Sequence, residues 1–402
     1  MVTLTEPVRR IAEQPVVARA MARLHETDAL TIREQCMLAS IAAPPFGEAV
    51  RGEWLETRFR ELGLDAIRTD EAGNVLAECG SADATSPVVV AAHLDTVFPA
   101  GTRLELRTEG NRIYLPGIAD NARGLATMLA VARVVRECGI ATDRTVVFVG
   151  SVGEEGIGDL RGVKHLFRPD SQFREAAGFI ALDGTEGRRI VCRAVGSSRH
   201  RIVVRGPGGH SWADRGTPNP IHVLGSAIAA LSKLRLASTP AWSVNVGRIG
   251  GGTSINAIPE DAWCELDLRS EDPGTLERLE GLAFDAIRAA AGHVNGDGRH
   301  RTGTLDIEIV RIGRRPAGET APDSRLVRIA KGATHFIGRR PELVASSTDA
   351  NVPMSLGIPA ISIGGGGDSG GMHTAGEWFE NTSGAQGIER ALLVILAAAS
   401  RP

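Results

Sequence analysis

The chain has 402 residues, of which 43% are hydrophobic and 23% are charged, and its formal net charge is −3. This balance is ordinary for a globular protein with a sizeable core, and it gives no sign of a nucleic-acid partner or of a membrane-binding surface. No apolar run approaches the roughly 18 to 20 residues that a membrane-spanning helix needs. The length favours two domains, or one large domain with an insertion.

The cysteines and the N-terminal segment indicate the cellular compartment in which the protein is found. The five cysteines are widely spread and no two form a CxxC pair; they are Cys36, Cys79, Cys138, Cys192 and Cys264. An odd, scattered set argues against a disulfide framework and against a thiolate zinc site. Residues 1–24 mix charges with apolar residues and lack the continuous apolar core of a signal peptide. We therefore expect a cytoplasmic protein.

The first part of the chain combines helices with short apolar strands. In chain order, the apolar periodicity predicts helices at about residues 18–38 and 48–62, a strand at 88–92, a helix at 122–137, and strands at 145–149 and 179–182. Buried strands that alternate with helices indicate an α/β fold in which helices sandwich a mostly parallel sheet.

The pattern changes near Gly196 and changes back after Pro316. Between them we expect a strand at 199–204, a helix at 220–234, strands at 243–249 and 261–269, a helix at 273–291 and a strand at 304–312. This order is the split βαβ arrangement of a small α+β domain. Afterwards come a helix at 324–337, an apolar run at 358–363 and a helix at 387–399. We predict one α/β domain in two segments, residues 1–195 and 317–402, interrupted by an α+β domain at 196–316.

Polar residues follow the predicted strands where each strand ends. His93 and Asp95 end the first buried strand, and because residues i and i+2 of a strand face the same way, Asp95 is placed to orient the ring of His93. A strand-end histidine beside a solvated aspartate is the alternative. Asp120 precedes the predicted helix at 122–137, where it is either a helix cap or a carboxylate that bridges two cations.

Two adjacent glutamates, Glu154 and Glu155, lie between glycines just after the second buried strand. Adjacent residues in extended chain point different ways, so one can bind a metal while the other faces a substrate. Asp183 ends the third buried strand, and His373 follows the last one after a glycine-rich run at 364–371. That run lacks the Lys-Ser/Thr of a phosphate-binding loop, which makes a nucleotide-binding protein the weaker alternative.

Five ligand candidates therefore gather near one edge of the sheet, where open α/β sheets bind ligands. They are His93, Asp120, Glu155, Asp183 and His373. Two divalent ions would bring four positive charges, which the three carboxylates and a bridging hydroxide would balance. Oxygen and imidazole ligands without thiolate predict zinc, with manganese or cobalt as alternatives. Paired metals activate water and polarise a carbonyl, so the pattern favours a hydrolase that cuts an amide bond.

The segments that carry these residues resemble a known family. HLD at 93–95, GIADN at 117–121, GEEG at 153–156, LDG at 182–184 and GGMHT at 370–374 are similar, in order and spacing, to the co-catalytic metallo-exopeptidase and deacylase family. That family includes carboxypeptidase G, peptidase T, aminoacylase and succinyl-diaminopimelate desuccinylase. The resemblance covers nearly the whole chain and implies a phosphorylase/hydrolase-like fold with an inserted lid domain.

The resemblance also implies a role for each residue of the site. His93 and Asp183 would share one metal ion, Glu155 and His373 would bind the second, and Asp120 would bridge the two. Glu154 would be the general base that takes a proton from the attacking water and passes it to the leaving amine, and Asp95 would orient His93. A cis peptide bond between Asp120 and Asn121 is expected by similarity.

The inserted domain resembles the lid or dimerisation domain of that family. RGPGGHS at 205–211 is similar to the motif around a lid histidine, which implies that His210 reaches the partner's active site in a homodimer and stabilises an oxyanion. Residues 251–259 and 267–269 are similar to two further motifs, which imply that Asn256 holds the substrate and that Arg269 binds a substrate carboxylate. A turn histidine and a surface strand arginine are the alternatives.

The choice of substrate depends on one ligand. By resemblance, Asp rather than Glu at Asp183 favours an aminopeptidase or tripeptidase that acts on short peptides. An N-acyl-amino-acid amidohydrolase is the alternative within the class, and a binding relative that has lost catalysis is a more distant one. All the residues required for catalysis are present, which argues against such a loss.

Overall fold

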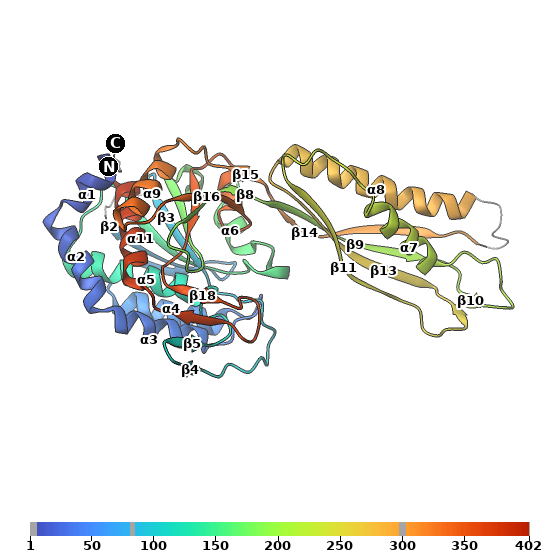
Figure 1. The fold of residues 1–402 in the computed structure, drawn as a ribbon, viewed down its shortest axis with the longest axis horizontal. Helices are drawn as coiled ribbons and strands as arrows, with labels where there is room; N and C mark the ends of the chain where they lie inside the picture. The colour runs from blue at the N-terminus through green and yellow to red at the C-terminus, as the bar shows by residue number, and fades with distance from the viewer. Residues whose placement is uncertain (1–5, 81–84, 297–302, 402) are drawn as a thin grey trace. The chain divides into compact units, whose positions relative to one another are not determined.

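The computed structural model describes residues 6–80, 85–296 and 303–401, which fall into two compact units (Figure 1). Unit 1 comprises Met1–Ala194 and Gly318–Pro402, and unit 2 comprises Val195–Ala317. Within the described ranges, no helix combines the length and the hydropathy that spanning a bilayer requires.

Unit 1 is built on a nine-stranded mixed sheet with the order β1-β2-β6-β3-β7-β17-β8-β15, and β16 pairs with β8. Its strands are β1 (Asp65–Thr69), β2 (Val75–Gly80), β3 (Val88–His93), β6 (Thr145–Ser151), β7 (Gly178–Leu182), β8 (Arg189–Ala194), β15 (Gly318–Glu319), β16 (Glu342–Ser346) and β17 (Ala360–Ile363). The neighbours β6, β3, β7 and β17 run parallel, and all their residues are buried. The predicted α/β fold with a largely parallel centre is confirmed.

Alternate residues of β3 enter two hydrophobic clusters, because successive side chains of a strand point to opposite faces. Val88 and Val90 pack with the helices of one face, and Val89 and Ala91 pack with those of the other. The first face carries α1 (Glu6–Ala12), α2 (Pro15–Glu26), α3 (Asp28–Ala39), α4 (Ala49–Glu61), α5 (Ala122–Cys138), α9 (Arg325–Phe336) and α11 (Gly384–Ala399). The second carries α6 (Arg161–Leu166), α10 (Asn351–Ser355) and a short 3-10 turn at Gln172–Glu175. Another 3-10 turn, Gly156–Gly158, directly follows Glu155.

A smaller four-stranded sheet in unit 1 has the order β18-β19-β5-β4. Its strands are β4 (Arg107–Glu109), β5 (Arg112–Tyr114), β18 (Asp368–Gly370) and β19 (Trp378–Glu380). Strands of three residues are too short to show a period in the sequence, so this sheet was not predicted. It holds the hairpin between β18 and β19, which carries residues 371–377.

Unit 2 is an antiparallel sheet with the order β11-β13-β9-β14 and two helices. The elements are β9 (Gly196–Arg205), β10 (Gly209–His210), α7 (Pro220–Leu231), β11 (Trp242–Gly251), β12 (Ala257–Ile258), β13 (Asp261–Ser270), α8 (Pro273–Gly296) and β14 (Asp306–Arg315). Residues of α7, α8 and one face of the sheet form a hydrophobic cluster of their own. The order of the long elements matches the split βαβ arrangement expected from the sequence.

One predicted helix differs from the structure. The single helix expected at 18–38 is two helices, α2 and α3, which meet at Thr27. The hydroxyl of Thr27 donates to the carbonyl of Arg23 at 2.8 Å. Such a bond from a threonine side chain to the backbone four residues earlier competes with regular helix geometry, and this competition accounts for the break.

Candidate metal centre

The five ligand candidates lie at one edge of the main sheet of unit 1. His93 is the last residue of β3, Asp183 directly follows β7, and Glu155 lies shortly after β6. Asp120 lies just before α5, and His373 comes from the hairpin between β18 and β19. The carboxyl ends of parallel strands meet at this edge, and the loops bring the other two side chains to the same place.

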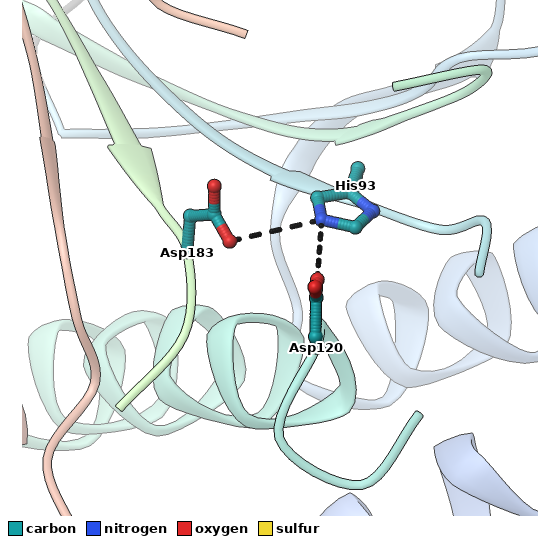
Figure 2. Close-up of side chains that lie close together, drawn as sticks. All are labelled: His93, Asp120 and Asp183. Atoms are coloured by element: carbon teal, nitrogen blue, oxygen red, sulfur yellow. Dashed lines mark ion pairs between the residues drawn. The ribbon is translucent and has the colours of Figure 1, made fainter. Parts of the chain in front are cut away.

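Asp120 stands between the two histidines. Its Oδ1 lies 3.1 Å from Nε2 of His93, and its Oδ2 lies 3.0 Å from Nε2 of His373. Nε2 of His93 is also 3.8 Å from Oδ1 of Asp183 (Figure 2). Nε2 of His373 is 3.1 Å from Oε1 of Glu155. Two groups of three residues therefore share Asp120, and in each group the potential ligand atoms lie within 4.8 Å of one another.

The chemistry of these groups fits a pair of divalent cations. All five residues offer imidazole nitrogens or carboxylate oxygens, which suit Zn²⁺, Mn²⁺ or Co²⁺. Oδ1 of Asp120 is buried and has no hydrogen-bond partner among the described residues, although it faces His93. A buried carboxylate oxygen that accepts no hydrogen bond calls for an explanation, and a bound cation would provide it.

Strong charge interactions govern the protonation of this cluster. Burial alone would raise the pKa of Asp120, but His373 and His93 outweigh it and hold that pKa well below its usual range. Burial would lower the pKa of His93, but Asp120, Asp183 and Asp95 raise it well above its usual value. Asp120 and Glu155 raise the pKa of His373 to about 10. Because an imidazole must be neutral to ligate, metal binding here is coupled to proton release.

The carboxylate of Asp95 contacts the two glutamates more closely than it contacts His93. Its Oδ1 accepts from the backbone N–H of Glu154 at 2.9 Å, and its Oδ2 accepts from that of Glu155 at 2.7 Å. Nδ1 of His93 lies 3.0 Å from the main-chain oxygen of Asp95 but 3.7 Å from its Oδ1. Asp95 therefore fixes the turn that carries Glu154 and Glu155, and its main chain is the nearer partner of the ring.

The two glutamates are both buried, although they lie in a loop. Gly153 precedes them with a positive φ of 67°, which an L side chain rarely adopts, and a Cβ there would meet Cγ of Arg161 at 2.6 Å. The glycine therefore allows the sharp turn after β6, and the bonds to Asp95 hold it.

Asn121 connects the Asp120 loop to the end of β7. Its Oδ1 accepts from the N–H of Gly124 at 3.1 Å and caps α5, and its Nδ2 donates to the carbonyl of Leu182 at 2.9 Å. The peptide bond between Asp120 and Asn121 is cis, as the resemblance implied. The helix cap is thus Asn121, and Asp120 is free of the capping role that was its alternative.

The glycine-rich run at 364–371 is explained by close packing. A Cβ on Gly365 would meet Oγ1 of Thr127 at 2.2 Å, and one on Gly366 would meet Cα of Gly387 at 2.7 Å. A Cβ on Gly367 would meet Cε2 of Phe379 at 2.4 Å. The run passes directly against α5, α11 and β19, where no side chain fits.

Arg51 is a buried residue near the site to which the sequence analysis gave no role. It lies on α4 and donates from Nη1 to the carbonyl of Leu94 at 2.7 Å and from Nε to that of Ile41 at 3.1 Å. Burial lowers the pKa of Arg51 to about 10, and the negative charges of Asp95 and Glu377 oppose that shift. The sequence could have indicated that Arg51 is buried, because it lies four residues before Leu55 and therefore on the same, buried face of the helix.

Two buried carboxylates near the site also went unpredicted. Asp349 lies close enough to interact with the charges of His93, Asp95 and Asp183, and its Oδ2 accepts from Oγ of Ser151 at 2.5 Å. Burial raises the pKa of Asp349 to about 6, although the nearby charge of His93 acts against it. Burial raises the pKa of Glu377 to about 7, although its carboxylate accepts three backbone hydrogen bonds.

The residues predicted for the lid all lie in unit 2. His210 is in β10, which pairs with β12, and both His210 and Asn256 are exposed. The N–H of Ser211 donates to the main-chain oxygen of Asn256 at 3.0 Å, so the segment just after His210 lies beside Asn256. Arg269 lies on β13, where its Nε donates to Oδ2 of Asp267 at 2.8 Å. Their roles toward a substrate remain predictions.

Comparisons with known proteins place these features in context. The profile of the peptidase family M20/M25/M40 matches residues 89–397. The uncharacterized protein YqjE of Bacillus subtilis is 28% identical over 338 residues, which cover 80% of this chain and 86% of that protein. A putative succinyl-diaminopimelate desuccinylase of Mycobacterium tuberculosis is 28% identical over 318 residues, or 77% of this chain and 81% of that one.

Solved structures agree with the fold. The aminopeptidase PepT of Bacillus cereus superimposes with a TM-score of 0.73 at 25% identity, covering 92% of this chain and 98% of that one. A tripeptidase of Staphylococcus aureus has a TM-score of 0.77 at 23% identity, with the same coverage. The family profile spans more than half of the chain, from the strand that ends in His93 to the last helix. The chain therefore belongs to peptidase family M20/M25/M40 and is a metal-dependent hydrolase of peptide or related amide bonds.

Proposed function

We propose that the chain is a two-metal exopeptidase that acts on short peptides in the manner of an aminopeptidase or tripeptidase. The similarity to an aminopeptidase and a tripeptidase supports the choice of short peptides. The observation that carries the two-metal part of the proposal is the position of Asp120, whose two oxygens each face a different histidine at 3.0–3.1 Å. A carboxylate so placed can bridge two cations, and each cation then has two further ligands within reach. His93 and Asp183 would complete one set, and Glu155 and His373 the other.

The donor set supports zinc, with manganese or cobalt as the alternatives. Two divalent ions, when bound, would supply an activated water and a polarised scissile carbonyl. The three carboxylates among the ligands would leave the pair of ions with a small net positive charge, which suits a negatively charged attacking group.

Glu154 is assigned as the general base of this reaction. Its backbone N–H is held by Asp95 at 2.9 Å, and its neighbour Glu155 is held in the same way, so the base and a metal ligand share one anchor. A buried carboxylate in this position would take the proton from the attacking water and deliver it to the amine that leaves. The bonds to Asp95 fix the backbone of the turn that carries this base.

Unit 2 is assigned as the lid and dimerisation domain. His210 would reach the active site of a partner subunit. There it would donate a hydrogen bond to the oxyanion that forms at the scissile carbonyl of the bound substrate. Asn256 and Arg269 would hold the substrate, with Arg269 exchanging Asp267 for a substrate carboxylate. An exposed edge strand, β11, and the exposed side chains of Ile249 and Ile255 support a homodimer through this unit.

A deacylase is the second candidate, because relatives with that activity are also similar to this chain. The acetylornithine deacetylase of Klebsiella pneumoniae is 26% identical over 330 residues. Its substrate class would also offer a free carboxylate to Arg269. We further propose a cytoplasmic location, which the five free cysteines support, since unpaired thiols persist in a reducing compartment.

A substrate screen tests the proposal. Purified protein loaded with Zn²⁺, Mn²⁺ or Co²⁺ is assayed on a panel of tripeptides and dipeptides and, in parallel, on N-acetyl and N-succinyl amino acids. We expect release of the N-terminal residue from tripeptides to be fastest. Faster hydrolysis of the acyl amino acids would favour the deacylase instead. Failure to bind about two divalent ions per chain would overturn the two-metal assignment itself.

A further inference from the structure

Glu377 is a fully buried carboxylate. Among the residues that the structure describes, its side chain accepts hydrogen bonds from the main chain of one short loop, residues 117–120. Its Oε2 accepts from the N–H of Gly117 at 2.8 Å, and its Oε1 accepts from the N–H groups of Ala119 at 2.8 Å and Asp120 at 3.0 Å. The main-chain oxygen of Glu377 also accepts from the N–H of Leu115 at 3.1 Å. Four hydrogen bonds therefore tie this residue to the segment that ends in Asp120.

Glu377 also belongs to the hairpin that carries His373. The N–H of Glu377 donates to the carbonyl of Thr374 at 3.1 Å, and the N–H of Thr374 donates to the carbonyl of Gly371 at 3.0 Å, so the tip of the hairpin is tightly turned. The same hairpin thus contacts Asp120 twice. His373 faces its carboxylate at 3.0 Å, and Glu377 accepts from its backbone N–H.

The chemistry of the contact requires a carboxylate. Three N–H donors converge on two oxygens, and they favour the ionised carboxylate against the burial that raises its pKa. In that form the carboxylate has only acceptor sites, so every donor is satisfied. A glutamine would present an NH₂ group to at least one of these N–H donors, and two donors would then face each other in a buried site. The loop would have to shift to relieve the conflict, and Asp120 would shift with it.

We propose that Glu377 is a positioning residue that sets the spacing between Asp120 and His373 and thereby the affinity and geometry of the second metal ion. The inference rests on the proposed two-metal function. Both ions share Asp120, but the hairpin of Glu377 also carries His373, which would bind the second ion alone. The side chain of Glu377 is bonded to the loop at 117–120 and to neither His93 nor Asp183, so its effect on the first metal ion is smaller than on the second.

The test compares Glu377→Gln with the parent chain and with Glu380→Gln. Glu380 is a matched control because it lies three residues later, on β19, and pairs with Arg112 at 3.2 Å rather than with the ligand loops. Each protein is stripped with a chelator and titrated with Zn²⁺ against a competing chromophoric chelator. The visible spectrum of the Co²⁺-loaded protein is recorded as a second readout, and circular dichroism verifies that each variant is folded at the temperature used.

We expect Glu377→Gln to bind its first ion almost as the parent does and its second ion about 10–100-fold more weakly, as is typical when a contact that orients a ligand is lost. Its Co²⁺ spectrum should change, whereas that of Glu380→Gln should match the parent. Parent-like affinity for both ions together with a parent-like spectrum would overturn the proposal, even if the variant were less stable to heat.

A second variant covers the case in which Glu377→Gln does not fold. Glu377→Asp keeps the charge but withdraws the carboxylate by one methylene, so it reaches fewer of the three N–H donors, and the same selective weakening of the second ion is expected. Equal weakening of both ions in a folded variant would also contradict the proposal. If the parent chain itself bound fewer than two ions, the two-metal function would fail instead, and the two failures are distinguishable.

Discussion

Substitution of Arg51 tests how the first strand and its loop are held. Arg51 is buried, and it donates to the carbonyls of Ile41 and Leu94, the second of which directly follows His93. Arg51→Met keeps the length of the side chain but leaves both carbonyls without their donor, and it removes a positive charge that interacts with Asp95 and Glu377. The substitution therefore removes the hydrogen bonds and the charge interactions of Arg51 together.

The expected loss of stability follows from the burial. Hydrogen bonds from a charged donor contribute about 1.5–3 kcal/mol each, and breaking a buried charge interaction from one side costs about 3–5 kcal/mol. Because these two figures describe overlapping effects, we expect the free energy of unfolding to fall by about 3–5 kcal/mol. The control is Arg60→Met on the same helix, since Arg60 is exposed and pairs with Glu56 one helical turn away, a contact worth about 0.3–0.5 kcal/mol.

Urea denaturation followed by circular dichroism gives the measurement. A chain with two units can unfold in more than one step, so the two variants are compared on the same transition. Arg51→Met should move the midpoint down by at least about 1 M, and Arg60→Met should leave it nearly unchanged. A midpoint for Arg51→Met within about 0.2 M of the parent would show that the buried guanidinium does not hold this loop.

Three further predictions concern the base, the lid and the response to acid. Glu154→Gln should abolish turnover but retain about two metal ions per chain in metal analysis; residual turnover above background would remove Glu154 as the base. His210→Ala should lower kcat by about 10²–10³-fold, and mixing it with Glu154→Gln should restore some activity if the site is shared across a dimer; no recovery from verified mixed dimers would contradict sharing. Burial lowers the pKa of His200 below its unfolded value, with Glu280 opposing, so the folded state resists protonation. Its contribution to stability is therefore complete above the unfolded pKa of about 6.5 and declines as the pH falls below it. Urea midpoints of unit 2 at pH 7 and pH 5 should differ less for His200→Gln than for the parent, and equal differences would refute the assignment.

The parts of the site that the sequence could indicate are those that follow a strong local pattern. His93 and Asp183 end apolar runs that are unmistakably buried strands, and Glu155 lies between glycines directly after another. Parallel strands order these ends along one edge, so their proximity follows from topology alone. The family, the fold and the hydrolase function are confirmed by the comparisons, whereas the individual roles of the residues remain predictions.

The parts that escaped prediction depend on contacts between distant segments. The bonds from Gly117 and Asp120 to Glu377 join residues about 260 positions apart. No local sequence pattern around Glu377 and His373 indicates that such bonds form. The bonds of Asp95 to the Glu154–Glu155 turn were likewise invisible, because the strand pattern placed Asp95 beside His93 and said nothing of β6. Short strands such as β4 and β18 carry too few residues to show a period.

The close packing of the glycine run limits how this enzyme can diversify. There is no room for even one methyl group at Gly365, Gly366 or Gly367. Substitutions at these positions would therefore prevent folding before they could alter substrate choice. Two exposed apolar side chains, Ile157 and Met372, lie next to the ligand loops and meet no such restriction. A library designed to change selectivity should therefore hold the glycine tract constant and randomise the latter two positions.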